Sequence, residues 1–159
     1  MDSMGEKERV SIMAVARIES AFPKIRKEGY KITSVETPDY NCFAWAIDDK
    51  SKWWSPAADG GYYWPDGVPK NTAVKSFIKL YKIEGGYEPC DNDRVEKGFE
   101  KIAIYADTLG DVTHVAKQKT SGKWTSKLGD WEDLEHNTLV ALEGDFYGKA
   151  VQILKRAVK

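Results

Sequence analysis

Cys42 is the residue whose type and position best suit covalent chemistry in this sequence. It stands in YNCFAWAI at 40–47, an Ala-rich apolar run that predicts a buried helix with Asp39 or Asn41 as its N-cap. A helix start carries partial positive charge and free N–H groups, which favour a thiolate and can receive an oxyanion. Because only the thiolate is a nucleophile, the position fits acyl chemistry. The alternative is a small buried hydrophobe, as most free cysteines are.

His114 is the candidate general base for that cysteine. The segment VTHVAKQ at 112–118 predicts a strand, whose residues alternate between two faces. A half-buried imidazole needs hydrogen-bond partners, so His114 is either a satisfied core histidine or a base that faces a thiol. A base also needs an orienting group, which His136, Ser126 or Gln118 could supply; we favour His136, which could equally be a surface residue. The predicted catalytic set is Cys42, His114, His136 and Ser126.

Aromatic residues are the unusual component of the composition. The chain has six Trp and eight Tyr in 159 residues, many of them between Tyr40 and Trp64. Such side chains bury much apolar area and keep a polar handle, so they form either a core with a groove wall or a ligand platform. The segment 51–70 is rich in Pro and Gly and predicts a long loop. The residues expected to line a substrate cleft are Tyr40, Asn41, Trp53, Trp54, Trp64 and Trp124.

Other chemistries have little support in the sequence. Cys42 and Cys90 are too few for a disulfide framework or a four-thiolate zinc site, and no CxxC or HxxxH spacing occurs. The motifs GxSxG, GxGxxG and GxxxxGK[ST] are absent as well. We therefore expect two free thiols, no metal and no cofactor.

The charge balance and hydropathy of the sequence argue against two classes of partner, nucleic acids and membranes. The formal net charge is −1, from 24 basic and 25 acidic side chains, which argues against a nucleic-acid or anionic-membrane surface. No apolar stretch approaches the length of a membrane span, and the first residues lack the order of a signal peptide. We expect a cytoplasmic protein with no nucleic-acid and no membrane partner; the oligomeric state stays open.

The elements that must position these residues are helices first and strands later. Helices are predicted at 6–22, from Cys42 to 47, and at 73–82, with a short strand at 30–35. Strands follow at 101–107, 112–118, 123–128, 138–142 and 150–156, and 131–137 is predicted to be irregular or a short helix. This order predicts one α+β domain over 1–159, with N-terminal helices packed on an antiparallel sheet and a core at 30–156.

Several motifs carry a resemblance to a known family. They are YNCFAWAI at 40–47, the WW and YWP groups at 53–54 and 63–65, EKGFEKIAIYAD at 96–107, THVAKQ at 113–118, GKWTSKLGD at 122–130 and FYG at 146–148. Over residues 30–156 the chain resembles an uncharacterised bacterial domain family of unknown function, which implies no activity.

The layout also resembles papain-like cysteine hydrolases of the NlpC and CHAP kind. In those enzymes a cysteine opens a helix packed on an antiparallel sheet, a histidine follows on a later strand, and a third polar residue lies on the next. The resemblance implies a papain-like architecture, although NCFAWA at 41–46 departs from the usual DCSGF-like or QCxxY-like signatures.

Three functions remain open on these observations. The first is a thiol hydrolase or acyl transferase that acts on an amide-type bond of an unidentified small-molecule or peptide substrate. The second is a non-catalytic ligand- or protein-binding module that uses the aromatic loop 53–64. The third is a toxin or effector domain built on the same cysteine-hydrolase plan.

Overall fold

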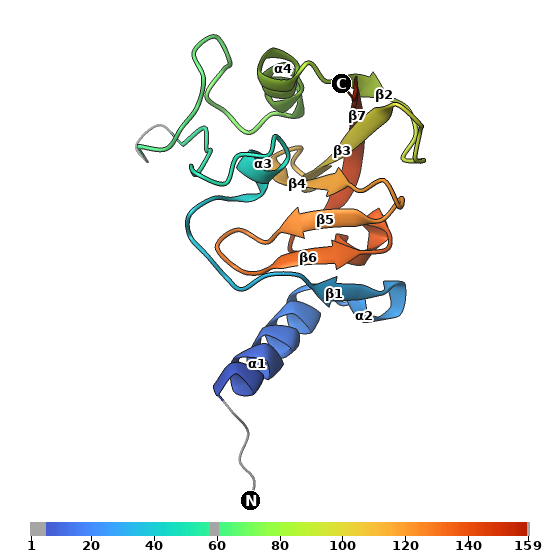
Figure 1. The fold of residues 1–159 in the computed structure, drawn as a ribbon. Helices are drawn as coiled ribbons and strands as arrows, with labels where there is room; N and C mark the ends of the chain where they lie inside the picture. Colours follow the sequence, from blue (N-terminus) through green and yellow to red (C-terminus); the bar gives the residue numbers. More distant parts are fainter. Residues whose placement is uncertain (1–5, 58–60, 159) are drawn as a thin grey trace, which may run out of the picture.

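The computed structural model describes residues 6–57 and 61–158, and their fold is α+β (Figure 1). The helices are α1 (Glu6–Ala21), α2 (Ile25–Glu28), α3 (Cys42–Trp45), α4 (Val74–Gly85) and the 3-10 helix η1 (Leu139–Leu142). The strands are β1 (Tyr30–Ile32), β2 (Glu88–Cys90), β3 (Phe99–Ala106), β4 (Val112–Gln118), β5 (Trp124–Lys127), β6 (Asp133–His136) and β7 (Lys149–Ala157). They form one sheet in the order β1-β6-β5-β4-β3-β7-β2, and every neighbouring pair is antiparallel.

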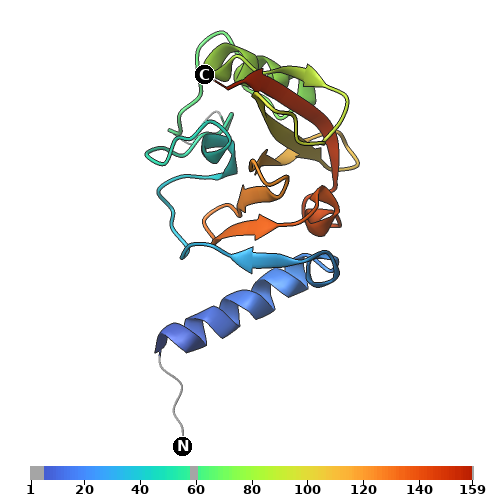
Figure 2. The same cartoon turned by 45° about the vertical axis from the view of Figure 1, so that its right-hand side comes forward.

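The centre of the sheet is a meander of four strands, β3 to β6, and short turns connect each strand to the next. The last strand, β7, returns to pair with β3 on its other side, and β1 pairs with β6 at the opposite edge. Figures 1 and 2 both place α1 beside β1, with the N-terminal part of the helix running away from the sheet. Among the described residues, no helix has the length and apolar composition to cross a bilayer.

Strand alternation divides the apolar side chains between the two faces of the sheet. On one face Ile102 and Ile104 pack with Val115 and with residues of α3 and α4. On the other, Ala103 and Tyr105 pack with α1, α2 and η1. The sheet is therefore covered on both faces, which explains why its central strands are buried along most of their length.

Much of this order follows the sequence prediction. The predicted helices at 6–22 and 73–82 are α1 and α4, and the strands at 101–107, 112–118, 123–128 and 150–156 are β3, β4, β5 and β7. The strand predicted at 30–35 is shorter and ends at Ile32. The helix predicted to run from Cys42 to 47 is the single turn of α3. Positions 58–60 of the predicted loop lie outside the described residues.

Two predictions near the C-terminus are wrong, and a third missed a strand. The segment 131–137 contains β6, whose four residues are all buried although three can carry charge. It is a strand because its polar side chains find partners; the Glu135 carboxylate, for example, pairs with three lysines. The segment 138–142 is η1 rather than a strand, since the Thr138 hydroxyl caps it by accepting from Ala141 N at 3.3 Å. The strand β2 lies in a segment, 85–90, for which no strand was predicted.

Candidate functional site

A chain of hydrogen bonds joins three of the four predicted catalytic residues. His114 Nε2 lies 2.9 Å from Ser126 Oγ, and Ser126 Oγ lies 2.8 Å from His136 Nε2. His136 Nδ1 lies 2.8 Å from the carbonyl oxygen of Thr138. All three side chains are completely buried. The backbone ladder between β4 and β5 contains two pairs, Lys117 with Thr125 and Gln118 with Trp124. Outside this ladder, the hydrogen bond between the His114 and Ser126 side chains connects the two strands.

The donor and acceptor of each hydrogen bond in this series follow from the carbonyl oxygen at its end. The Thr138 carbonyl can only accept, so the proton of neutral His136 is on Nδ1 and its Nε2 accepts the Ser126 hydroxyl proton. Ser126 Oγ must then accept from His114, which places the His114 proton on Nε2. His114 Nδ1 is left with a lone pair, and this buried atom has no hydrogen-bond partner among the described residues.

Burial keeps both imidazoles neutral. It lowers the pKa of His114 well below its usual value, and His136 lowers it further. The pKa of His136 falls to about 4, mainly through burial, against a smaller opposing effect of the Thr138 carbonyl. The two histidines therefore act as hydrogen-bonding groups near neutral pH, and His114 offers one basic nitrogen.

The His114 ring is covered by Tyr147. The two rings are stacked, with centroids 4.3 Å apart and planes 7° from parallel. Tyr147 belongs to the turn 144–148, which the backbone bonds between Gly144 and Gly148 close. Gly148 has φ +78°, and a Cβ there would lie 2.0 Å from the Ala106 carbonyl oxygen, so this turn requires glycine. The turn thus fixes Tyr147 against His114.

Cys42 lies at the first position of α3, against β4. Asn41 caps this helix: its Oδ1 accepts from Ala44 N and from Trp54 N, both at 3.2 Å, and its Nδ2 donates to the Trp54 carbonyl at 2.6 Å. Both backbone polar groups of Trp54 are therefore bound to Asn41. This side chain holds the aromatic loop beside Cys42.

The Cys42 thiol is buried and protonated near neutral pH. Burial raises its pKa to about 12, although the backbone N–H groups of Val115, Phe43 and Cys42 itself, together with the Lys127 ammonium, oppose the rise. Val115 directly follows His114 on β4, but their side chains point to opposite faces: Val115 packs on the face that α3 covers, and His114 lies with Tyr105 on the other. No hydrogen bond joins Cys42 to His114: His114 Nε2 bonds Ser126, and its Nδ1 bonds no described residue.

Lys127 is a buried cation close to this site. Its ammonium donates to the carbonyl oxygens of Thr37, at 2.8 Å, and Gly129, and it lies 5.2 Å from the Tyr40 ring centre. Burial lowers its pKa. Lys127 joins two loops that flank Cys42 and places positive charge near the thiol.

A pocket of about 320 Å³ opens onto Cys42. Aromatic side chains from separate parts of the chain dominate its wall: Phe43, Trp53, Trp131, Phe146 and Tyr147. A neighbouring pocket shares Trp53, Gly129 and Asp130 with it and extends to Pro38 and Tyr62. Cys42 is 5% exposed, so the thiol borders the pocket although it is mostly covered.

The predicted substrate-binding residues divide between this pocket and the core. Asn41 and Trp53 line the pocket. Tyr40 is buried, and its hydroxyl donates to Asp133 Oδ2 at 2.7 Å. The remaining three, Trp54, Trp64 and Trp124, are buried in the two apolar clusters. Trp54 Nε1 donates to Asp49, and Trp64 Nε1 donates to Val68.

Sequence reasoning missed four aromatic residues of the pocket wall, one of which, Phe43, directly follows Cys42. Phe146 and Tyr147 come from the FYG motif at 146–148, and Trp131 follows the SKLGD segment at 126–130. A glycine directly after two aromatic residues is a signal for a turn that presents them. Both motifs contributed to the family resemblance, but their local pattern does not indicate that they meet Cys42.

A larger groove, of about 660 Å³, lies around Cys90 and the loop that follows β2. Asp91, Asp93 and Glu143 line it, yet no three His, Cys, Asp or Glu side chains among the described residues are placed to hold a metal ion. The Cys90 thiol donates a hydrogen bond to the Asn92 carbonyl oxygen at 3.4 Å. Both cysteines are free thiols.

Comparison with known proteins gives a family and no activity. A family model described as a domain of unknown function (DUF7689) matches residues 31–155. A search of curated proteins and a search of solved structures each found no match.

Proposed function

Because the chain belongs to the DUF7689 family, whose function is unknown, we propose its activity from the geometry: a cysteine-dependent hydrolase or acyl transferase of papain-like plan acting on an amide-type bond. Cys42 is the nucleophile, His114 the base, Ser126 and His136 the positioning residues. The observation that carries the proposal is the free lone pair of His114 Nδ1, a buried acceptor without a partner.

An unpaired buried acceptor costs about 1–3 kcal/mol and therefore needs an explanation. The hydrogen bonds through Ser126 and His136 hold the proton of His114 on Nε2, so Nδ1 is the nitrogen able to take a proton. The Cys42 sulfur meets the amide of Val115, the residue next to His114. Nδ1 is thus the ring nitrogen of the two histidines with a free lone pair. In the proposed reaction it takes the proton of the thiol, and the hydrogen bonds through Ser126 and His136 hold its ring.

The proposed reaction has two steps, acylation of Cys42 and release of the acyl group. The Cys42 thiol gives its proton to His114 Nδ1 while its sulfur attacks the substrate carbonyl carbon. The carbon–nitrogen bond breaks, the leaving amine takes the proton from Nδ1, and a thioester remains on Cys42. Water, or an acceptor amine in a transferase, then attacks the thioester with Nδ1 as base, and the thiol returns.

Backbone amides supply the oxyanion stabilisation in this proposal. The N–H groups of Cys42 and Phe43 are directed towards the sulfur and have no other acceptor among the described residues. Donors of this kind stabilise the charge on a tetrahedral intermediate. Burial opposes a thiolate or an imidazolium alone, so the free protein holds a neutral pair, the Cys42 thiol and the His114 imidazole. In the reaction one proton transfer creates both charges, and each then stabilises the other.

Acylation by an activated ester tests the proposal. The protein is mixed with 4-nitrophenyl acetate, and the acetyl adduct is located by intact mass and peptide mapping. We expect one adduct, on Cys42, that forms with a burst of nitrophenolate. His114→Gln should slow its formation about 10²-fold or more, since it removes the base. Ser126→Ala should slow it less, because the base remains but loses its positioning bond.

The matched control is Cys90→Ala, which removes the other thiol and should leave the burst unchanged. Circular dichroism of each variant confirms that loss of acylation does not reflect unfolding. Equal labelling of Cys42 and Cys90, or a His114→Gln variant that reacts like the parent protein, would contradict the proposal.

A second candidate function is a non-catalytic binding module. The aromatic wall of the Cys42 pocket favours it, because Trp53, Trp131 and Phe146 provide stacking surface that needs no chemistry. In this case Cys42→Ala retains ligand binding and no acyl adduct forms on the parent protein.

A further inference from the structure

Asp130 is the only charged side chain among the described residues that line the Cys42 pocket and its neighbour. It is exposed and forms no ion pair with any described residue. The nearby Lys127 does not neutralise it by direct contact, because the Lys127 ammonium is bonded to the carbonyl oxygens of Thr37 and Gly129. Asp130 is therefore the one charged group on the described wall of an aromatic groove, and the buried Lys127 ammonium lies behind that wall.

Two aromatic rings stand beside this carboxylate. Trp53 lines both pockets with Asp130, and Tyr62 lines the outer one. Their ring centroids are 6.2 Å apart and the planes are tilted by 40°. Tyr62 is half exposed. The two rings form an angled wall rather than a flat stack.

Several other aromatic rings near the surface of the described chain are covered by the protein's own cations. The Arg17 guanidinium lies 4.5 Å from the Trp131 ring centre, and the Lys52 ammonium lies 4.7 Å from that of Tyr63. Neither Trp53 nor Tyr62 has such a cation among the described side chains. Their faces are therefore available to a cation from outside the chain.

We propose that the groove binds a cationic group of the substrate, an ammonium or guanidinium on an aliphatic stem, between Asp130 and the rings of Trp53 and Tyr62. The inference rests on the proposed function in taking the Cys42 pocket as the substrate site, and it names the substrate class: amides or peptides with a lysine- or arginine-like side chain. The carboxylate supplies the opposite charge, and the rings supply cation–π contact. The apolar wall near Phe43 and Phe146 accommodates the stem.

Binding to the Cys42→Ala variant tests the inference without any turnover. The probes are Nα-acetyl-lysine methylamide, its norleucine analogue, which lacks only the ammonium, and the corresponding glutamate compound. The readout is the indole N–H signal of Trp53 in NMR titrations. We expect the lysine probe to bind about fivefold to tenfold more tightly than the norleucine probe at low salt, with the difference shrinking as salt is added.

Asp130→Asn should abolish the preference for lysine over norleucine, because the asparagine keeps the shape and loses the charge. Asp91→Asn is the matched control: it removes one charge from the groove at Cys90 and should preserve the preference. Equal binding of the lysine and norleucine probes overturns the inference. So does tighter binding of the glutamate probe, or of methyl N-acetylglucosaminide as a sugar that stacks on the same rings.

The failure of this inference and that of the proposed function are distinguishable. If Cys42 is acetylated by 4-nitrophenyl acetate but the lysine probe shows no preference, the thiol chemistry stands and the substrate class is wrong. If no acyl adduct forms but the preference for lysine depends on Asp130, the pocket binds cations and the hydrolase proposal fails.

Discussion

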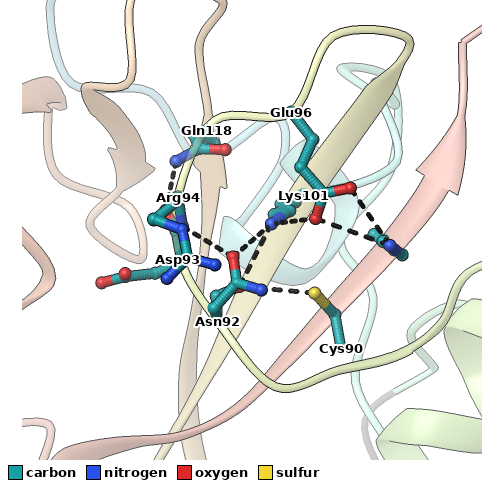
Figure 3. Close-up of polar contacts among 8 residues, drawn as sticks. Cys90, Asn92, Asp93, Arg94, Glu96, Lys101 and Gln118 are labelled. Atoms are coloured by element: carbon teal, nitrogen blue, oxygen red, sulfur yellow. Dashed lines mark hydrogen bonds and ion pairs between the residues drawn. The ribbon is translucent and has the colours of Figure 1, made fainter.

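The regions around the two cysteines are built from similar parts. Each has a buried thiol and a buried lysine, Lys127 near Cys42 and Lys101 near Cys90. In the Cys90 region every member of the polar cluster finds a partner (Figure 3). Lys101 Nζ reaches Glu96 Oε1 at 2.8 Å and Asn92 Oδ1 at 2.9 Å. The cluster also contains the bond from the Gln118 amide to the Asp93 carbonyl, at 2.7 Å.

The difference between the regions is the state of their buried polar atoms. The Cys90 cluster is saturated, and it ties the loop 91–98 to β3 and β4, so it is a structural feature. The Cys42 region leaves His114 Nδ1 without a partner. Proteins keep such an unpaired atom where a substrate, a proton or an unseen water uses it. An unsatisfied buried group behind the pocket wall, as His114 Nδ1 is behind Tyr147, is thus a better indication of a site than a thiol, which both regions have.

The largest effect we expect comes from the turn that holds Tyr147. Gly148→Ala places a Cβ 2.0 Å from the Ala106 carbonyl oxygen, at φ +78°. The backbone must shift, and we expect the free energy of unfolding to fall by about 4 kcal/mol or more. Urea denaturation followed by circular dichroism measures the loss.

A glycine near the Cys90 region provides the matched control. Gly98 has φ +87°, yet a Cβ there meets no atom within 4 Å. Gly98→Ala should therefore cost only the conformational strain, about 1 kcal/mol. Similar losses for the two variants would contradict the claim that contact with β3, rather than φ, makes Gly148 necessary.

The sequence was informative where a local pattern decides the structure. The Pro- and Gly-rich loop, the helix α4 and the strands β3 and β4 have regular spacing of apolar residues, and the order Cys42, His114, Ser126 and His136 was sufficient to select residues that include a bonded trio. Contacts between residues far apart in the sequence could not be predicted from it. Tyr147 meets His114 because Gly148 approaches β3, a contact that no local pattern records.

Burial of charged residues was the other failure of sequence reasoning. Lysine is almost never fully buried unless it is paired, so no local pattern marks Lys127 as a buried residue. Its partners, the carbonyl groups of Thr37 and Gly129, are separated from one another by a long stretch of chain. The strand β6 was missed for the same reason: its buried Glu135 is compensated by lysines from β1 and from the β4–β5 turn.

The second prediction concerns the resting state of Cys42. Burial raises the pKa of its thiol from an ordinary value of 9.0 to about 12, which corresponds to roughly a thousandfold less thiolate at pH 8. We expect iodoacetamide to label Cys42 about a thousandfold more slowly in the folded protein than in guanidinium. Mass spectrometry at timed intervals gives both rates. Faster labelling in the folded protein would show a preformed thiolate and refute the neutral pair.

The third prediction uses the two neutral histidines. An unfolded imidazole gains its proton near pH 6.5, whereas folded His136 gains it near pH 4. Between these values the unfolded state binds more protons, so acid favours unfolding. The stability from His136 is complete above pH 6.5 and falls by about 3 kcal/mol by pH 4. His114 acts in the same direction, because its pKa is also lowered.

Urea midpoints measured from pH 7 to pH 4 test this dependence. His136→Gln removes one titrating group, so its stability should decline less over the same range. A variant with the same slope as the parent protein would mean that His136 is not the group responsible. The Cys90 cluster has no histidine among the residues drawn in Figure 3, so substitutions there should leave the slope unchanged above about pH 5. At lower pH the lowered pKa of Glu96, which its hydrogen bond from Lys101 causes, also contributes.

The smallest effect we expect lies in the saturated cluster itself. Lys101→Met keeps the volume of a completely buried side chain and removes its bonds to Glu96 and Asn92. We expect a loss of about 2 kcal/mol in the free energy of unfolding, because Glu96 is partly exposed and can be hydrated again. The control is Lys155→Met, which removes the more exposed partner of the same carboxylate and should cost less than about 1 kcal/mol. Neither variant should change the rate at which Cys42 is acetylated, and a change in that rate would mean that the two cysteine regions are coupled.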